Sequence, residues 1–283
     1  MGSVTDGGDG REAAMWADAH NHLQDPRLRG HLASGGGYPC IVNATHEEDW
    51  EDVLAITAEE PVRRAALGIH PWYADEARTG WDERLGLALE ANPSAGIGEC
   101  GLDSKAGSVA LEKQMPVFTR QLRLARELDR SVTIHLTGAW GALLDALDRE
   151  PPPRRWLMHS FNGSPEIAER LAAMGACFSI SGRAMHPSGE KIFRSFRAIP
   201  AERILVETDA PNQPPPALNV GRELPDGLNA PENLALIGEA VAGRLGFDPA
   251  CFARITMRNF ACFAGVHGGR EQLRAKDEMM DSR

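Results

Sequence analysis

The feature that most limits the possible folds is a strict alternation of short apolar runs with longer segments of helical period. Eight runs have the length and composition of β-strands, and each is followed by a segment whose apolar residues recur with helical spacing. The predicted strands are residues 15–23, 39–44, 64–70, 95–101, 131–136, 155–161, 176–182 and 203–209. Most are continuously apolar, as buried parallel strands are. The alternation predicts an α/β fold, a (β/α)8 TIM barrel, and leaves a doubly wound open sheet as the alternative.

Local signals place the helices and the limits of the domain. Ser164 followed by Pro165 predicts a helix start, and Thr45 with Glu48 three residues later resembles a capping box. The longest predicted helix, 111–130, contains Pro116, which we expect near its start or at a kink. No shift in composition marks a second domain. We expect one catalytic barrel domain over 15–268, with a flexible tail at 1–14 and another at 269–283.

Charge and composition exclude several classes of protein. The formal net charge of −10 argues against a general nucleic-acid coat or a binder of anionic membranes, because both need broad basic surface. No stretch approaches the roughly 20 apolar residues of a membrane helix, and residues 1–14 lack the apolar region of a signal peptide. We therefore expect a cytoplasmic protein without a membrane partner. The five cysteines include no C-x-x-C pair, so neither a disulfide framework nor a thiolate zinc site is indicated.

Polar side chains collect where the predicted strands end, which is where a barrel of this type builds its active site. They are His20, His22, His70, Glu99, His135, His159, Glu207 and Asp209. His20 and His22 are two residues apart on one strand, so both imidazoles point to the same face. An isolated pair of this kind is more often two hydrogen-bonded core histidines. The carboxylates and imidazoles on the other strands favour a metal site instead, because such a buried cluster is stable chiefly with metal.

Six of these residues suffice for two divalent ions: His20, His22, Glu99, His135, His159 and Asp209. Imidazole and carboxylate ligands without thiolate indicate Zn²⁺, Mn²⁺ or a related ion, with Mg²⁺ as a further candidate.

An ordered set of motifs resembles the TatD-type metal-dependent deoxyribonucleases, a branch of the amidohydrolase-like TIM barrels. The motifs are DAHNHL at 18–23, GIHPW at 68–72, GIGECGLD at 96–103, TIHL at 133–136, MHSFNGS at 158–164, LVETDAP at 205–211, LNAPENL at 228–234 and NFACF at 259–263. The resemblance implies that His20, His22, Glu99 and Asp209 hold one metal. It implies that Glu99, His135 and His159 hold the second, with Glu99 bridging the two.

The ligand set predicts hydrolysis by water activated between two cations, which lower its pKa toward neutrality. Glu99 and Asp209 are the expected catalytic residues, with Asp209 as general base. We expect His70 to contact phosphate, with a helix-cap or core histidine as the alternative. Glu207 is expected to orient a metal-bound histidine or to form an ordinary buried ion pair.

The sequence departs from the family pattern at positions expected to bind substrate. Residues 136–139 read Leu-Thr-Gly-Ala without the usual arginine, Leu228 stands where an arginine usually precedes Asn229, and Ser104 follows Asp103 in place of an aromatic residue. Lys105, Arg183 and Arg222 are the candidate substrate-binding cations that remain, although an arginine such as Arg183 is more often a solvated loop residue.

Three functions stay open. The first is a phosphodiesterase acting on DNA ends or single-stranded DNA, the second is a hydrolase of a lactone, ester or amide, and the third is an inactive binding or scaffold subunit. The complete ligand set argues against the third. No residue pattern identifies a protein partner.

Overall fold

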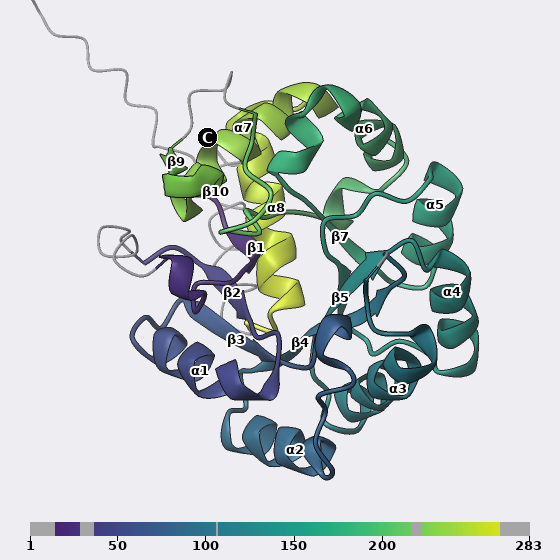
Figure 1. The fold of residues 1–283 in the computed structure, drawn as a ribbon. Helices are drawn as coiled ribbons and strands as arrows, with labels where there is room; N and C mark the ends of the chain where they lie inside the picture. Colours follow the sequence, from purple (N-terminus) through teal and green to yellow (C-terminus); the bar gives the residue numbers. More distant parts are fainter. Residues whose placement is uncertain (1–14, 29–36, 106, 217–221, 267–283) are drawn as a thin grey trace, which may run out of the picture.

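The computed structural model describes residues 15–28, 37–105, 107–216 and 222–266 and shows a closed parallel barrel surrounded by helices (Figure 1). The strands, in order around the barrel, are β1 Asp18–Asn21, β2 Cys40–Asn43, β3 Arg63–Leu67, β4 Gly96–Asp103, β5 Val132–Thr137, β6 Trp156–Met158, β7 Cys177–Ile180 and β8 Ile204–Val206. Asp18 of β1 pairs with Val206 of β8, which closes the barrel. The TIM-barrel prediction is confirmed, and the open sheet is excluded.

The helices follow the strands along the chain. They are α1 Trp50–Ala58, α2 Trp81–Ala91, α3 Leu111–Glu127, α4 Trp140–Arg149, α5 Pro165–Ala173, α6 Glu190–Phe196, α7 Leu234–Leu245 and α8 Pro249–Phe263. A short antiparallel pair, β9 Glu223–Leu224 and β10 Leu228–Asn229, lies in the long segment after β8. In the described part of the chain, no helix combines the length and the apolar character needed to cross a membrane. The predicted tails, 1–14 and 269–283, lie outside the described residues.

The helix signals were read correctly at α5 and wrongly at α1. Ser164 caps α5 by accepting a hydrogen bond from the Ile167 backbone N–H at 3.4 Å, as predicted. The predicted partner of Thr45 was Glu48, but the Thr45 hydroxyl donates to Asp49 at 3.0 Å. The turn begins one residue later than predicted, with His46 as its N-cap. Asp49 therefore occupies the third helical position, from which its carboxylate accepts a hydrogen bond from the N-cap backbone N–H. Pro116 lies inside α3.

Helix α3 positions the ends of β3 and β4 by hydrogen bonds from two buried glutamines. Gln121 accepts from the Ile69 backbone N–H at 2.8 Å and donates to the Ile69 carbonyl at 3.1 Å. Gln114 accepts from the Asp103 N–H at 2.8 Å and donates to the Asp103 carbonyl at 2.7 Å. The backbone on either side of the predicted site is therefore fixed from the helix layer.

Candidate metal centre

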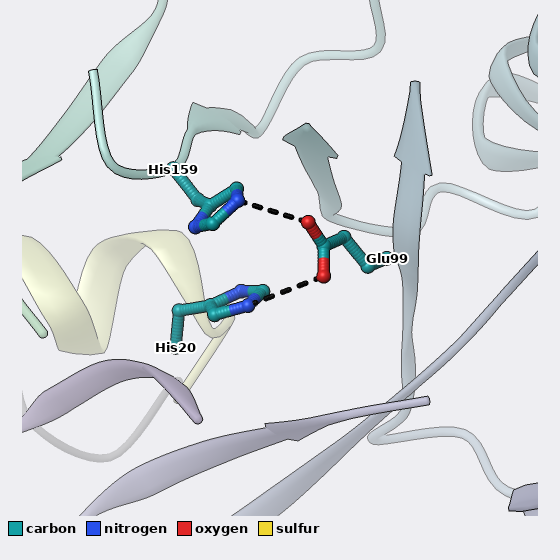
Figure 2. A group of neighbouring side chains, drawn as sticks. All are labelled: His20, Glu99 and His159. Atoms are coloured by element: carbon teal, nitrogen blue, oxygen red, sulfur yellow. Dashed lines mark ion pairs between the residues drawn. The ribbon is translucent and has the colours of Figure 1, made fainter. Parts of the chain in front are cut away.

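The structure brings all six predicted metal ligands together at the carboxyl ends of the barrel strands. His20 lies in β1, Glu99 in β4 and His135 in β5, while the other three follow the ends of β1, β6 and β8. Several strands are shorter than predicted because their last polar residues leave the sheet: β8 ends at Val206, and Asp209 has a φ of 54°. The side chains are buried, with His135 the most exposed at 15%. Figure 2 shows His20 and His159 facing the two oxygens of Glu99.

One group of donor atoms consists of Nε2 of His20, Nε2 of His22, Oε2 of Glu99 and Oδ1 of Asp209. The two Nε2 atoms are 3.1 Å apart and lie 3.4 and 3.3 Å from Glu99 Oε2. They lie 3.6 and 3.5 Å from Asp209 Oδ1. Ligand atoms that surround a tetrahedral ion at about 2.0–2.1 Å are about 3.3–3.4 Å from one another. The residues of the first group therefore fit one divalent cation.

The second group surrounds the other oxygen of Glu99. Oε1 is 2.8 Å from His135 Nδ1 and 2.9 Å from His159 Nε2, and these nitrogens are 3.4 Å apart. A hydrogen bond from His135 and an ion pair with His159 hold these side chains close together around Glu99 Oε1. Each carboxylate oxygen of Glu99 thus faces a different pair of imidazoles, the arrangement of a bridging ligand.

Neighbouring protein groups favour Nε2 as the metal-binding nitrogen of His22 and of His159. His22 Nδ1 donates to the Asn43 carbonyl at 2.9 Å, which leaves the Nε2 lone pair for the first group. His159 Nδ1 lies 3.5 Å from Glu207 Oε1, and Glu207 Oε2 accepts from the Ser179 hydroxyl at 2.5 Å. Glu207 thus forms a buried ion pair with His159, and its role in orienting that histidine stays a prediction.

Protons and negative charges balance each other in this buried centre. Burial alone would lower the pKa of His22, yet hydrogen bonds to Asp209 and Glu99 raise it to about 10. Burial also works against His159, but the charges of Glu99 and Glu207 raise its pKa well above the ordinary value. Despite their burial, the surrounding imidazoles lower the pKa of Glu99 and of Asp209. The carboxylates are ionised and attract either protons or metal.

His70 lies beside the second group and combines features of all three sequence interpretations. It is 4% exposed, and its Nδ1 accepts a hydrogen bond from the Trp72 backbone N–H at 3.1 Å, as a helix-capping residue does. Because Nδ1 is the acceptor, neutral His70 carries its proton on Nε2, which lies 3.6 Å from Glu99 Oε1. His70 thus offers the centre a hydrogen-bond donor. His70, Glu99 and His135 are close enough to hold an ion, but this tautomer of His70 does not suit a metal ligand.

Two residues at the site were missed in the sequence. Asp103 is 1% exposed, and its Oδ2 lies 3.3 Å from His135 Nε2 and accepts from the Trp72 indole at 2.7 Å. Gln213 donates to Asp209 Oδ2 at 2.5 Å. The signal for Asp103 was present, since it ends the GIGECGLD motif. Nothing in the local sequence pattern singles out Gln213. It reaches Asp209 because the chain turns back between the two residues.

The three predicted substrate-binding cations are exposed side chains around the barrel. Lys105 follows β4 directly, and its backbone N–H donates to Asp103 Oδ1 at 2.7 Å. Arg183 lies in a 3-10 helix, Gly182–Met185, after β7. Arg222 pairs with Glu232, which offsets its charge. Their contact with substrate stays a prediction.

Comparison with known proteins identifies the family of the chain. Residues 17–264 match the family model described as TatD related DNase. The chain is 32% identical over 242 residues to the uncharacterized metal-dependent hydrolase YjjV of Escherichia coli K12, covering 82% of this chain and 91% of that protein. It is 31% identical over 208 residues to the 3'-5' ssDNA/RNA exonuclease TatD of the same organism, covering 71% of this chain and 78% of that protein.

The crystal structure of E. coli YjjV superimposes with a TM-score of 0.80 at 27% identity and covers 89% of this chain and 98% of that one. A TatD family hydrolase from Entamoeba histolytica, at 17% identity, shares the fold with a TM-score of 0.74 and covers 89% of this chain and 99% of that one. The chain therefore belongs to the TatD-related DNase family of metal-dependent hydrolases.

Proposed function

We propose that this protein is a two-metal phosphodiesterase that removes nucleotides from the ends of single-stranded DNA. The observation that carries the proposal is the placement of Glu99, whose Oε2 faces His20 and His22 while Oε1 faces His135 and His159. A single buried carboxylate between two imidazole pairs serves two cations better than one. Zn²⁺, Mn²⁺ and Mg²⁺ are the candidate ions.

When bound, the two cations would lower the pKa of a water molecule and neutralise charge on a phosphodiester. Asp209 is placed to accept the proton of that water, because its lowered pKa keeps it ionised and Gln213 fixes its second oxygen at 2.5 Å. His70 would donate a hydrogen bond from Nε2 to a nonbridging oxygen of the phosphate. Glu207 would hold His159 in the orientation that presents Nε2 to the centre.

The named activity of a relative supports this substrate class. E. coli TatD, 31% identical to this chain, is named a 3'-5' ssDNA/RNA exonuclease. Single-stranded RNA is therefore the second nucleic acid to test.

A second candidate, hydrolysis of a lactone, ester or amide, is favoured by one observation at the rim. Arg222 is paired with Glu232, and both Lys105 and Arg183 are exposed. None of these three candidate residues is therefore a buried arginine that could bind a phosphate through two hydrogen bonds. The same metal centre serves a carbonyl substrate equally well. The choice between the two candidates is a choice of substrate.

The test combines metal analysis with a substrate panel. Chelator-stripped protein is reconstituted with Zn²⁺, Mn²⁺ or Mg²⁺ and assayed on single-stranded DNA, RNA, duplex DNA, bis-p-nitrophenyl phosphate and simple lactones. We expect two bound ions per chain and hydrolysis of single strands. Two bound ions with cleavage of lactones and of no phosphodiester would overturn the nuclease assignment.

Glu99→Gln tests the bridge directly. Because the variant lacks the negative charge between the two cations, it should bind less metal and its activity should fall by at least about a hundredfold. Glu169→Gln, an exposed change of the same kind on α5, serves as the control. If Glu99→Gln retained both metal and activity, the two-metal proposal would be wrong.

A further inference from the structure

Trp72 is an exposed aromatic side chain held rigidly beside the metal centre. It is 52% exposed, and among the described residues the other large apolar side chains with comparable exposure are Met15, Val62 and Leu87, none of them aromatic. Its indole N–H donates to Asp103 Oδ2 at 2.7 Å. Because Asp103 is itself buried, the ring is fixed in orientation while much of its surface stays open to solvent.

The indole lies next to the imidazole of His70 and to that of His135, which belongs to the second group. Its ring centroid is 4.9 Å from that of His70, at an interplanar angle of 80°, and 6.4 Å from that of His135, at 66°. The Trp72 backbone N–H also holds His70 Nδ1 at 3.1 Å. Asp103 Oδ2 joins the same network, since it lies 3.3 Å from His135 Nε2. A group resting on the indole therefore lies directly beside the expected site of phosphate cleavage.

We propose that Trp72 is the surface on which a nucleobase next to the scissile phosphate stacks. The inference rests on the proposed phosphodiesterase function and names how that site holds its substrate. An aromatic face attracts a base of any sequence and needs no positive charge, which suits a protein of net charge −10 whose rim arginine Arg222 is paired with Glu232. A rigid ring also loses little conformational entropy when a base stacks on it.

The competing explanation is that Trp72 merely braces Asp103 and the turn after β3. A structural brace would affect every substrate equally. A stacking surface affects only substrates that carry a base, so the informative quantity is the ratio of two rates measured on one variant.

The experiment uses the metal-reconstituted full chain and a single-stranded oligonucleotide whose first-removed nucleotide is identified with the wild type. In a second oligonucleotide, a tetrahydrofuran abasic residue replaces that nucleotide. We expect the wild type to prefer the base-containing substrate about five- to hundredfold in kcat/KM, the range that loss of one stacked base produces. Trp72→Leu should bring this ratio close to one.

Trp72→Phe separates stacking from bracing, because phenylalanine keeps an aromatic face and lacks the indole N–H. It should retain most of the preference. Leu87→Ala, an exposed apolar change on α2, should retain the wild-type ratio. Thermal melting of each variant verifies folding, and the ratio cancels any general loss of activity.

Four outcomes overturn the inference. If Trp72→Leu keeps the wild-type ratio, or if the wild type shows no preference, no base stacks on Trp72. If Trp72→Phe loses the preference as completely as Trp72→Leu, the hydrogen bond to Asp103 is what matters. If the wild type cleaves neither oligonucleotide with any metal, the phosphodiesterase function itself has failed, and the inference fails with it.

Discussion

At the candidate metal centre, a protein group lies beside one ring nitrogen of His22, His159 and His70 and favours one tautomer of each. The Asn43 carbonyl holds Nδ1 of His22, and Glu207 lies beside Nδ1 of His159, so both present Nε2 to the centre. Nδ1 of His70 accepts from Trp72, so His70 presents a donor instead. The hydrogen bond at Nδ1 thus decides whether a histidine offers the centre a lone pair for a metal or an N–H donor.

Metal binding should strengthen as pH rises, because cations and protons compete for the same imidazoles. The pKa of His22 is raised to about 10 and that of His159 is raised as well, so both are protonated at pH 7 in the metal-free protein. A bound cation must displace these protons, so affinity falls as pH decreases, by about tenfold per unit for each proton displaced.

Calorimetric titration of apoprotein with Zn²⁺ in buffers of different ionisation enthalpy measures the number of protons released. We expect at least one proton per chain at pH 7. If the affinity for Zn²⁺ did not change between pH 6 and pH 8 and no proton were released, the prediction would be wrong.

The grouping of the six candidate ligands was predictable from the sequence, whereas the contacts of Asp103 and Gln213 were not. His20 and His22 share a strand face, and the other ligands end strands, so the barrel's geometry alone brings them together. Asp103 and Trp72, which form a hydrogen bond, are 31 residues apart in the sequence. The contact of Gln213 with Asp209 depends on a backbone turn in which Gln213 has a φ of 49°. Contacts between separate loops depend on backbone paths that apolar periodicity does not encode.

At the scale of elements, the site depends on how closely β4 and β5 approach and on how α3 holds the ends of β3 and β4. Gly101 pairs in register with His135. A Cβ on Gly101 would lie 2.0 Å from the His135 carbonyl oxygen. The alternation of apolar runs predicted these elements but overestimated several strands, since residues such as Asp209 are close to a strand in sequence and outside it in structure.

Gly101→Ala should destabilise the protein and weaken metal binding together. Its φ of 144° is unfavourable for alanine, and the new methyl group would push β5, with His135, away from Glu99. We expect a loss of about 1–3 kcal/mol in the free energy of unfolding, as overpacking usually costs. Gly86→Ala in α2, where the nearest atom is 3.8 Å away, is the control and should be neutral or stabilising. Urea denaturation and zinc titration of both variants give the comparison; equal stabilities would refute it.

Gln121→Leu should lower stability because it leaves two buried backbone groups of Ile69 without partners. Each unpaired group costs about 1–3 kcal/mol, so a total of about 2–6 kcal/mol is expected. Glu112→Leu, an exposed change on the same helix, should fall within about 0.5 kcal/mol of the wild type. Chemical denaturation measures both, and a Gln121→Leu protein as stable as the control would show that solvent or a backbone shift satisfies Ile69.

At the scale of the whole molecule, the net charge of −10 limits how a polyanion can be held. Affinity for nucleic acid usually comes from many Lys and Arg contacts to phosphates, each of which releases counterions. Here the expected contacts are local: a pair of cations, His70, the face of Trp72 and, at most, a few exposed basic residues. If the proposed phosphodiesterase function holds, we expect the protein to bind a strand end and to release it after each cleavage.

Cleavage of single-stranded DNA should therefore depend only weakly on salt. With about two phosphates contacted by cationic side chains, the slope of log(kcat/KM) against log[salt] should be no steeper than about −1.5, because each contact contributes about −0.7 for single strands. Between 50 and 200 mM salt the expected loss is less than about tenfold. Initial rates at subsaturating oligonucleotide and fixed metal concentration measure the slope, and an excess of unlabelled trap added after the first turnover should stop further shortening. A slope near −4, or processive shortening in the presence of the trap, would mean that a basic track outside the metal centre holds the strand.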